Sequence, residues 1–478
     1  MTRTKPKLAT DTAFGTLADN GRADRRGRNL DQTDTDESGG TRPTVASPDL
    51  TSSGVHSGGK NPIQTSPWAP HAMLLSLPLW WVVGMDVFIW PLLVLPLAWK
   101  LVVNRRDVNV PQGFHLWSLF LIWLALSALT LSDASPTRQL AFAWRASLYF
   151  SATVVFLYFY NASSTTLIRS TLLAATGYWM LIALGGYAGV IFPTASYESP
   201  MAHLVPAWLS ENKFVHDAVV YRGLAGIDPF SLPRPHAGFA YANPWGSTFA
   251  LLIPLVAAGY VHLSSAWMKA VIAALFGLAA VPLTFSLNRG AWLSIGIGLL
   301  YAAALGLWRK QPKLFWSAIV PGLMIGGMVA LTPLKDVAAQ NLQYKVDSNG
   351  TRLNLYREAF TGALESPLFG HGTPRPSPIA DEPSIGTHGH VWLVLFSQRF
   401  PGLFFFLGWL VFLLIGSRKA CSVAGAWCHV VVLMGAAQAF YYELAGTGLV
   451  IIFMAGALAL SDPFRATARG PYLSEKQA

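Results

Sequence analysis

The chain has 478 residues and a formal net charge of +10, and 53% of its residues are hydrophobic while only 12% are charged. A soluble domain carries about 25% charged residues. The sparse charge therefore excludes a soluble globular protein, and we expect lipid to surround most of the chain. Two cysteines, Cys421 and Cys428, exclude a disulfide framework and lack the spacing of metal ligands.

Residues 1–67 differ from the rest of the chain. They are rich in Gly, Ser, Thr, Asp and Arg and show no apolar periodicity. Such a segment cannot bury enough apolar surface to offset its ordering entropy, so a disordered cytoplasmic tail is predicted. No apolar region follows Arg25–Arg26 closely, which argues against a twin-arginine signal and against a cleaved signal peptide. The membrane domain then covers 68–462, and 463–478 form a cytoplasmic C-terminal tail.

Apolar stretches recur through the membrane domain, and a helix of roughly 20 residues crosses a bilayer. The first stretch is interrupted by Gly84, Asp86 and Pro91, so it predicts two short spans. About twelve transmembrane helices are expected, which makes the fold class an all-α polytopic membrane protein. The spans are expected at 71–85, 87–104, 113–132, 141–160, 168–192, 239–262, 266–286, 290–308, 314–334, 391–416, 424–442 and 445–461.

Basic residues indicate the orientation, because Lys and Arg accumulate in short cytoplasmic loops. With the N-terminus inside, every predicted inner loop is basic, and both termini are cytoplasmic. These loops carry Arg105–Arg106, Arg169, Lys269, Arg309–Lys310–Lys313 and Arg418–Lys419. Two long connections then face outward, 193–238 and 335–390, the second lying before the last three spans.

Loops of this length usually carry function. Within the second, 349–365 has apolar residues at helical spacing and predicts an amphipathic helix at the outer interface, with Thr351 as a possible cap. Five prolines in 366–385 predict a shaped loop after it.

Charged residues near the outer span ends are the candidate functional groups. Arg289 separates two apolar spans in a tight hairpin, where it either serves function or extends to the headgroups. Arg234 precedes another span, and by position alone it is a headgroup anchor. Glu443, at the outer turn between the last two spans, is either a functional carboxylate or a packing partner of an outer arginine.

Two histidines, His388 and His390, stand directly before the span that starts at Val391. Two residues apart, they do not share a helix face. No Asp, Glu or Cys lies at ligand spacing, so no metal site is predicted. A histidine is the side chain most available as a general base at neutral pH, although a loop histidine is more often structural.

Several catalytic signatures are absent from the sequence, namely a Walker A loop, GxGxxG, GxSxG, HExxH and a suitably placed DxD pair. No cofactor and no nucleic-acid partner is therefore expected. The candidate arginines and histidines all face outward, where nucleotide sugars are not supplied. An outward-facing enzyme would need a donor that is already activated and linked to lipid.

Four segments resemble the O-antigen ligase/polymerase family, in the family's order and over roughly 230–416. These segments are RPHAGFAYANPWG, NRGAWLSIGIGLL, NGTRLNLYREAFTGALESPLFGHG and HGHVWLVLFSQRFPGLFFFLG. The resemblance implies an all-helical bundle with a periplasmic cavity, similar to the metal-independent lipid-phosphosugar transferases of the GT-C type. It also implies a location in the bacterial inner membrane.

The resemblance assigns roles to individual residues. Arg289 and Arg234 match family arginines expected to bind a diphosphate, and Arg352 or Arg357 matches the arginine of the loop helix. His388 matches the family's histidine, because its spacing to Gly402 is that of the motif. Gly389 replaces the usual Asn after that histidine, so His390 remains a second candidate base.

The function implied is that of an O-antigen ligase. A glycan would move from a polyprenyl-diphosphate donor to an acceptor hydroxyl on a glycan or lipid, at the outer face of the bilayer and without a metal. A polymerase of lipid-linked repeat units shares these motifs. A lipid-linked glycan transporter or flippase would need charges at mid-membrane depth, and the centres of most spans have none. A structural protein without turnover is the remaining alternative.

Overall fold

A computed structural model describes residues 68–161, 164–227, 232–343, 346–377 and 383–461. These residues all belong to one of the two units of the chain, Lys60–Ala478. The two tails expected from the sequence, 1–67 and 463–478, lie outside the described residues, and the division into domains stays a prediction.

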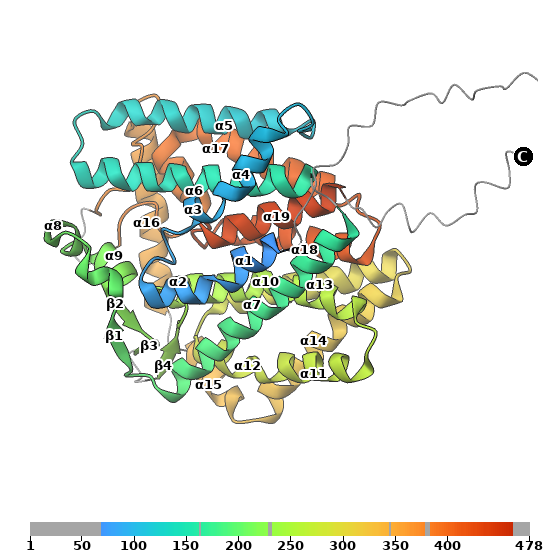
Figure 1. Cartoon of the computed structure of the whole chain (residues 1–478). Helices are drawn as coiled ribbons and strands as arrows, with labels where there is room; N and C mark the ends of the chain where they lie inside the picture. The colour runs from blue at the N-terminus through green and yellow to red at the C-terminus, as the bar shows by residue number, and fades with distance from the viewer. Residues whose placement is uncertain (1–67, 162–163, 228–231, 344–345, 378–382, 462–478) are drawn as a thin grey trace, which may run out of the picture. The chain divides into compact units, whose positions relative to one another are not determined.

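Eight described helical segments are long and apolar enough to cross a membrane. They include the longest helices labelled in Figure 1. The segments are α5 with η1 (Phe114–Ser127 and Ala128–Leu131), α6 (Pro136–Asn161), α7 (Thr165–Ile191), α10 (Ala242–His262), α11 with α12 (Ala266–Leu278 and Ala280–Phe285), α13 (Arg289–Trp308), α14 (Pro312–Leu331) and α17 (His390–Ser417).

Four shorter apolar helical segments complete the set. They are α1 with α2 (Ala69–Leu75 and Leu77–Val83), α3 with α4 (Trp90–Leu93 and Leu95–Val103), α18 (Val423–Gln438) and α19 (Thr447–Ser461). Every apolar stretch expected from the sequence is thus helical. This confirms a polytopic helical membrane protein, whereas the number of twelve crossings and the orientation stay predictions.

Helix α10 lies at the centre of the packing, against α7, α13, α18 and α19. Its middle residues are almost all buried, and polar side chains link it to its neighbours. The Ser247 hydroxyl on α10 donates to Gln438 Oε1 on α18 at 2.6 Å, and Gln438 Nε2 donates to Ser294 Oγ on α13 at 2.8 Å. Hydrogen bonds between helices in an apolar surrounding favour one register of packing.

The connection between α7 and α10 contains short β-strands. The expectation of an all-α fold is therefore wrong for this connection. It contains two short antiparallel sheets (Figure 1). In the first, β1 (Ser196–Glu198) pairs with β2 (Tyr221–Gly223), and in the second, β3 (Ala225–Ile227) pairs with β4 (Pro233–Pro235). Short helical turns lie between β1 and β2: η2 (Pro200–His203), α8 (Ala207–Ser210), α9 (Lys213–Val215) and η3 (His216–Val220).

The connection between α14 and α17 contains α15 (Leu334–Gln343) and α16 (Val346–Glu365). The predicted helix of this loop is confirmed in α16. Thr351 is wrong as its cap, because the helix begins five residues earlier, at Val346. The ring of Tyr356 stacks on Trp392 of α17 with centroids 4.6 Å apart, which holds α16 beside the start of α17.

A buried ion pair joins the turn between α2 and α3 to β2. Asp86 Oδ1 lies 3.2 Å from Arg222 Nη1, and Arg222 is only 1% exposed. Arg222 also donates to the carbonyl of Val219 at 3.4 Å. The end of α2 lies close to Ser199, and Gly84 permits this approach. Its φ is +96°, and a Cβ there would lie 2.3 Å from Ser199 Oγ.

Replacing Asp86 with asparagine should lower the free energy of unfolding by about 3–5 kcal/mol, because the charge of Arg222 would remain buried without a counter-ion. Thermal unfolding of the detergent-solubilised variant measures the loss. Lys213→Gln is the matched control: it breaks the ion pair of Lys213 with Asp217, in which Lys213 is 87% exposed, and should change stability little. Equal small effects of both substitutions would contradict a stabilising role for the buried pair.

Candidate functional site

The hairpin between α12 and α13 positions Arg289. Leu287 has a φ of +52°, which turns the chain sharply, and Asn288 caps α13 by accepting from the backbone N–H of Ala291 at 3.3 Å. Asn288 Nδ2 also donates to the carbonyl of Ala242 at 3.0 Å, so the hairpin is fixed to the start of α10. Arg289 is the first residue of α13 and is half-buried.

Arg234 reaches the same hairpin from a distant part of the chain. It lies in β4 opposite Gly226 of β3, and its Nε donates to the carbonyl of Ser286 at 3.3 Å. The acceptor is three residues before Arg289 in sequence. Two arginines that are 55 positions apart in the sequence therefore lie at one turn.

The turn between α18 and α19 connects this hairpin to the histidines. The hydroxyl of Tyr442 donates to Asn288 Oδ1, and the hydroxyl of Tyr441 donates to the carbonyl of Gly290 at 3.4 Å. On its other side, the Tyr442 carbonyl accepts from the backbone N–H of His390 at 2.8 Å. The arginine hairpin and the start of α17 are thus joined through a single residue.

Arg352 of α16 lies beside His388. Burial, and next the nearby charge of Arg352, lower the pKa of His388 from its usual value to about 4. The same charge acts on Tyr442, so Arg352 is within electrostatic range of both the histidine loop and the α18–α19 turn. Arg357, further along the same helix, is exposed. The structure therefore groups Arg352, and not Arg357, with the other candidates.

The hydrogen bonds of His388 define its tautomer. Thr387 has one hydroxyl proton, which it donates to the carbonyl of Ser384 at 2.7 Å. Its oxygen is then the acceptor for His388 Nδ1–H, at 3.2 Å. The proton of the neutral ring is consequently on Nδ1, and Nε2 has its lone pair available.

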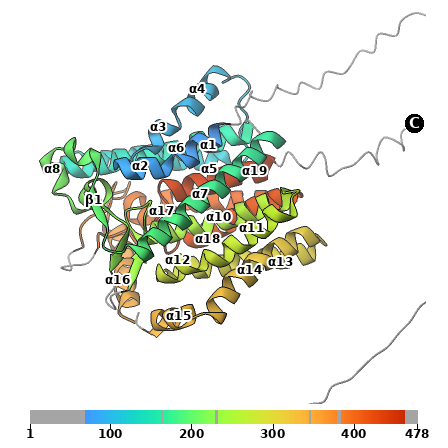
Figure 2. The ribbon, with the colours of Figure 1, turned by 60° about the horizontal axis from the view of Figure 1, so that its bottom comes forward.

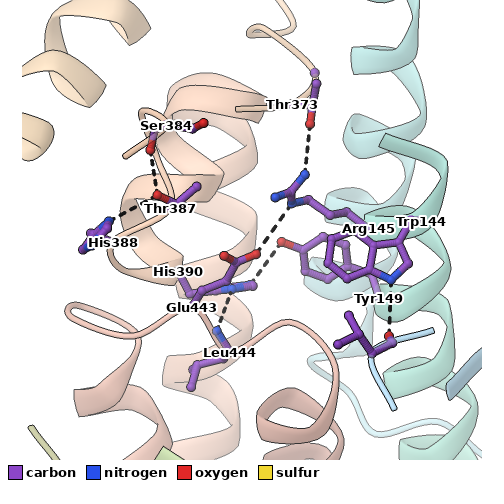
Figure 3. Close-up of polar contacts among 12 residues, drawn as sticks. Trp144, Arg145, Tyr149, Thr373, Ser384, Thr387, His388, His390, Glu443 and Leu444 are labelled. Atoms are coloured by element: carbon purple, nitrogen blue, oxygen red, sulfur yellow. Dashed lines mark hydrogen bonds and ion pairs between the residues drawn. The ribbon is translucent and has the colours of Figure 1, made fainter. Parts of the chain in front are cut away.

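His390 has the opposite tautomer. Its Nδ1 accepts from the backbone N–H of Leu444 at 3.3 Å, so the proton is on Nε2, 3.1 Å from the Tyr149 hydroxyl. The ring is completely buried, and both of its nitrogens are engaged within the protein. Figure 3 shows His388 directed away from the group that contains His390, Tyr149 and Glu443.

Gly389 separates the two histidines. Its φ is +123°, and a Cβ at this position would lie 2.6 Å from the carbonyl oxygen of Phe440. An L-residue rarely adopts this backbone conformation. The glycine that replaces the family's usual asparagine is therefore required by the backbone here.

Glu443 pairs with an arginine that sequence reasoning missed. Its Oε1 lies 3.6 Å from Nε of Arg145 on α6, and Arg145 Nη1 donates to Thr373 Oγ1 at 3.2 Å (Figure 3). Burial, partly opposed by Arg145, raises the pKa of Glu443. The alternative that Glu443 partners an outer arginine is the one that this geometry supports.

Further positive charge lies next to Arg145. Arg138, about two helix turns before it on α6, donates to the carbonyl of His371 at 3.1 Å. Burial, followed by the charges of Arg375 and Arg138, lowers the pKa of His371 to about 4.

The sequence contained a signal for Arg145, because this residue is a charge inside the predicted span 141–160.

The site as a whole carries more positive than negative charge. Arg234 and Arg289 lie at the α12–α13 hairpin, the charge of Arg352 acts on His388, and Glu443 is engaged with Arg145. Among the described residues, no three His, Cys, Asp or Glu side chains are grouped in a way that would hold a metal ion. This arrangement is suited to an anion with several oxygens, since guanidinium groups bind such anions through paired hydrogen bonds.

Comparison with known proteins gives one result for this region. A family model described as O-antigen ligase matches residues 272–393. The matched segment contains Arg289, Arg352 and both histidines, whereas Arg234 and Glu443 lie outside it. No curated protein matches the chain.

Proposed function

The match over residues 272–393 confirms the resemblance to the O-antigen ligase/polymerase family, and on that premise we propose that the protein transfers a glycan from a polyprenyl-diphosphate donor to an acceptor hydroxyl. The apolar helices and the family together indicate a bacterial inner-membrane protein. In the proposed reaction the bond between the anomeric carbon and the diphosphate oxygen breaks, and the acceptor oxygen bonds to that carbon. The polyprenyl diphosphate leaves, and the acceptor proton passes to a histidine.

The observation that carries this proposal is the link from the arginine hairpin, through Tyr442, to the backbone of His390, two residues after His388. Negative charge develops on the departing diphosphate as its bond to the sugar breaks. Arg289 and Arg234, at one turn, would hold its oxygens through charge-assisted hydrogen bonds. Arg352 would add charge next to the reacting hydroxyl, and no metal ion is then required for this neutralisation.

His388 is the general base in this proposal. Its Nε2 has a lone pair, and the Thr387 hydroxyl holds Nδ1–H and thereby the ring. The half-buried ring is accessible to an acceptor, while the completely buried His390 is not. We assign to His390 the role of holding the α18–α19 turn, and to Glu443 that of a counter-ion for Arg145.

The pH profile follows from the low pKa of His388. A base with a pKa of about 4 stays unprotonated well below neutrality, so kcat/KM should remain near its neutral value at pH 5.5. Arg352→Gln removes a positive charge that lowers this pKa, so the acid limb should move to higher pH. Transfer rates of the purified protein and of the Arg352→Gln variant between pH 4 and 8 measure the position of the acid limb. A shift to lower pH, or an acid limb near 6.5 in both proteins, would contradict the assignment.

Two other functions share parts of this evidence. A polymerase would use the same donor site with a second lipid-linked glycan as acceptor. A transporter or flippase for lipid-linked glycans would use the arginines to guide the anionic headgroup. The first experiment is therefore the size distribution of polyprenyl-diphosphate-linked glycans in cells that lack the protein.

Accumulated full-length polymer would support the ligase, because transfer to the final acceptor would be the missing step. Accumulated single repeat units would indicate the polymerase. If lipid-linked glycans accumulate only on the inner face, the transporter is supported instead. An unchanged pool in a strain without a second such enzyme would contradict glycan transfer altogether.

A further inference from the structure

A cavity of about 190 Å³ is lined in part by residues that directly follow β4, the strand that contains Arg234. It is smaller than the pockets of about 300–1,000 Å³ that hold drug-sized ligands, so its size suits a single ring. The side chains that characterise it come from the α2 helix, from η3 and β2, and from the segment after β4. They are Trp81, Asp217, Tyr221, His236, Phe239 and Tyr241.

Aromatic rings dominate this lining, and two of them lie at its opening. Tyr221 is 43% exposed and Tyr241 is 40% exposed, whereas Trp81 is 7% exposed and lies deeper. The face of an aromatic ring carries partial negative charge. It therefore attracts the C–H bonds on one face of a sugar ring, which carry partial positive charge.

Polar groups of the cavity complement the hydroxyls of a sugar. Asp217 accepts from the Tyr241 hydroxyl and from Lys213 Nζ, both at 2.9 Å. Burial acts to raise the pKa of Asp217, but these hydrogen bonds hold it below its usual value, so a carboxylate acceptor is present.

His236 adds an acceptor to the cavity. Its Nδ1–H donates to the carbonyl of Phe239 at 2.9 Å, so Nε2 has the lone pair. Burial is the main cause that lowers the pKa of His236, and the ring is therefore neutral at pH 7. An imidazole acceptor and a carboxylate thus line one small cavity with aromatic walls, which is the composition expected of a specific site for a polar ligand.

The cavity is close to the arginine that binds the diphosphate in our proposal. His236 follows Arg234 by two residues, and an extended chain advances about 3.3 Å per residue. The distance along the backbone is thus roughly that of one sugar ring. The sugar attached to a diphosphate held by Arg234 would be within reach of Tyr241 and His236.

We infer that this cavity is a saccharide subsite, which binds the sugar residue joined to the donor diphosphate. The inference rests on the proposed function and adds to it the selection of the donor by its glycan. The diphosphate site alone would also accept the product, a polyprenyl diphosphate without sugar. The cavity would let the protein bind the glycosylated donor more tightly than that product.

The test compares two probes on the purified full-length protein in nanodiscs. The first is undecaprenyl diphosphate, and the second is the same lipid carrying one N-acetylhexosamine, with N-acetylglucosamine and N-acetylgalactosamine tested separately. We expect at least one sugar to tighten binding about tenfold, the upper range of a single aromatic contact with its hydrogen bond. Tyr241→Ala should remove this increment, and Tyr241→Phe, which keeps the ring, should retain most of it.

Arg234→Gln is the matched control, since it should weaken binding of both probes and leave their ratio unchanged. Equal binding of all probes to the unmodified protein would overturn the subsite but leave the proposed function standing. Failure of every probe to bind would count against the proposed function itself. If Tyr241→Ala does not fold, Asp217→Asn takes its place, because this change keeps the side-chain volume. It should likewise reduce the ratio between binding of the glycosylated lipid and binding of the sugar-free lipid.

Discussion

Replacing His388 with glutamine should lower the transfer rate by about 10²–10⁴-fold, the usual contribution of a positioned general base. Glutamine can still bond to the Thr387 hydroxyl but cannot take up a proton from the acceptor. The ring is half-buried, and glutamine keeps a polar side chain of similar length there, so we expect the variant to fold normally. Single-turnover transfer of a radiolabelled lipid-linked glycan measures the effect.

His390 provides the comparison within the same loop. Its replacement by phenylalanine leaves the Leu444 N–H and the Tyr149 hydroxyl without their partner in a buried place. Each unsatisfied buried group costs about 1–3 kcal/mol. We expect a lower thermal midpoint for His390→Phe and a normal one for His388→Gln. A stable His390 variant without turnover, together with an active His388 variant, would reverse the two roles.

The different character of these two histidines could not be derived from the sequence. Spacing indicates only that residues two apart do not share a helix face, and it leaves both as candidates. What separates them is the positive φ of Gly389 and the position of the Phe440 carbonyl, and both depend on the packing of the α18–α19 turn. Tertiary contacts between segments far apart in the chain decide which ring nitrogen is protonated.

Local patterns were sufficient for the helices. Apolar stretches predicted each of the apolar helical segments in the described residues, because satisfaction of backbone hydrogen bonds in lipid leaves few alternatives. The short strands of the α7–α10 connection were missed, since three-residue strands have no readable alternation. The pairing of Asp86 with Arg222 was also missed, as nothing in either local sequence indicates the other.

The arginines were predicted unevenly for a related reason. Arg234, Arg289 and Arg352 lie in segments that resemble family motifs. The structure places the first two at one hairpin and the charge of Arg352 near His388. Arg145 lies in no such segment, although it is a charge inside an apolar span. Its partner Glu443 was identified as a candidate, and the 3.6 Å contact between them explains why both are tolerated at that depth.

Arg289→Lys should reduce transfer by about 10²–10³-fold, as expected when one preorganised donor to a developing anion is removed. Lysine keeps the charge but presents a single ammonium in place of a planar fork that can bond to two oxygens at once. The backbone should tolerate the change, since Asn288 caps α13 and the hairpin geometry depends on Leu287 and Asn288. Membrane levels should remain normal, and the rate loss should appear in kcat.

Arg309→Lys is the matched control, because Arg309 follows the other end of the same helix and donates to the carbonyl of Ala420 at 2.7 Å. This substitution makes the same chemical change away from the proposed site and should leave turnover near normal. If Arg289→Lys also keeps near-normal turnover, paired hydrogen bonding to the diphosphate is contradicted, and Arg289 is a headgroup anchor. If both variants lose activity together with stability, the arginines support the packing of α13, and the diphosphate must be held by Arg234 and Arg352 alone.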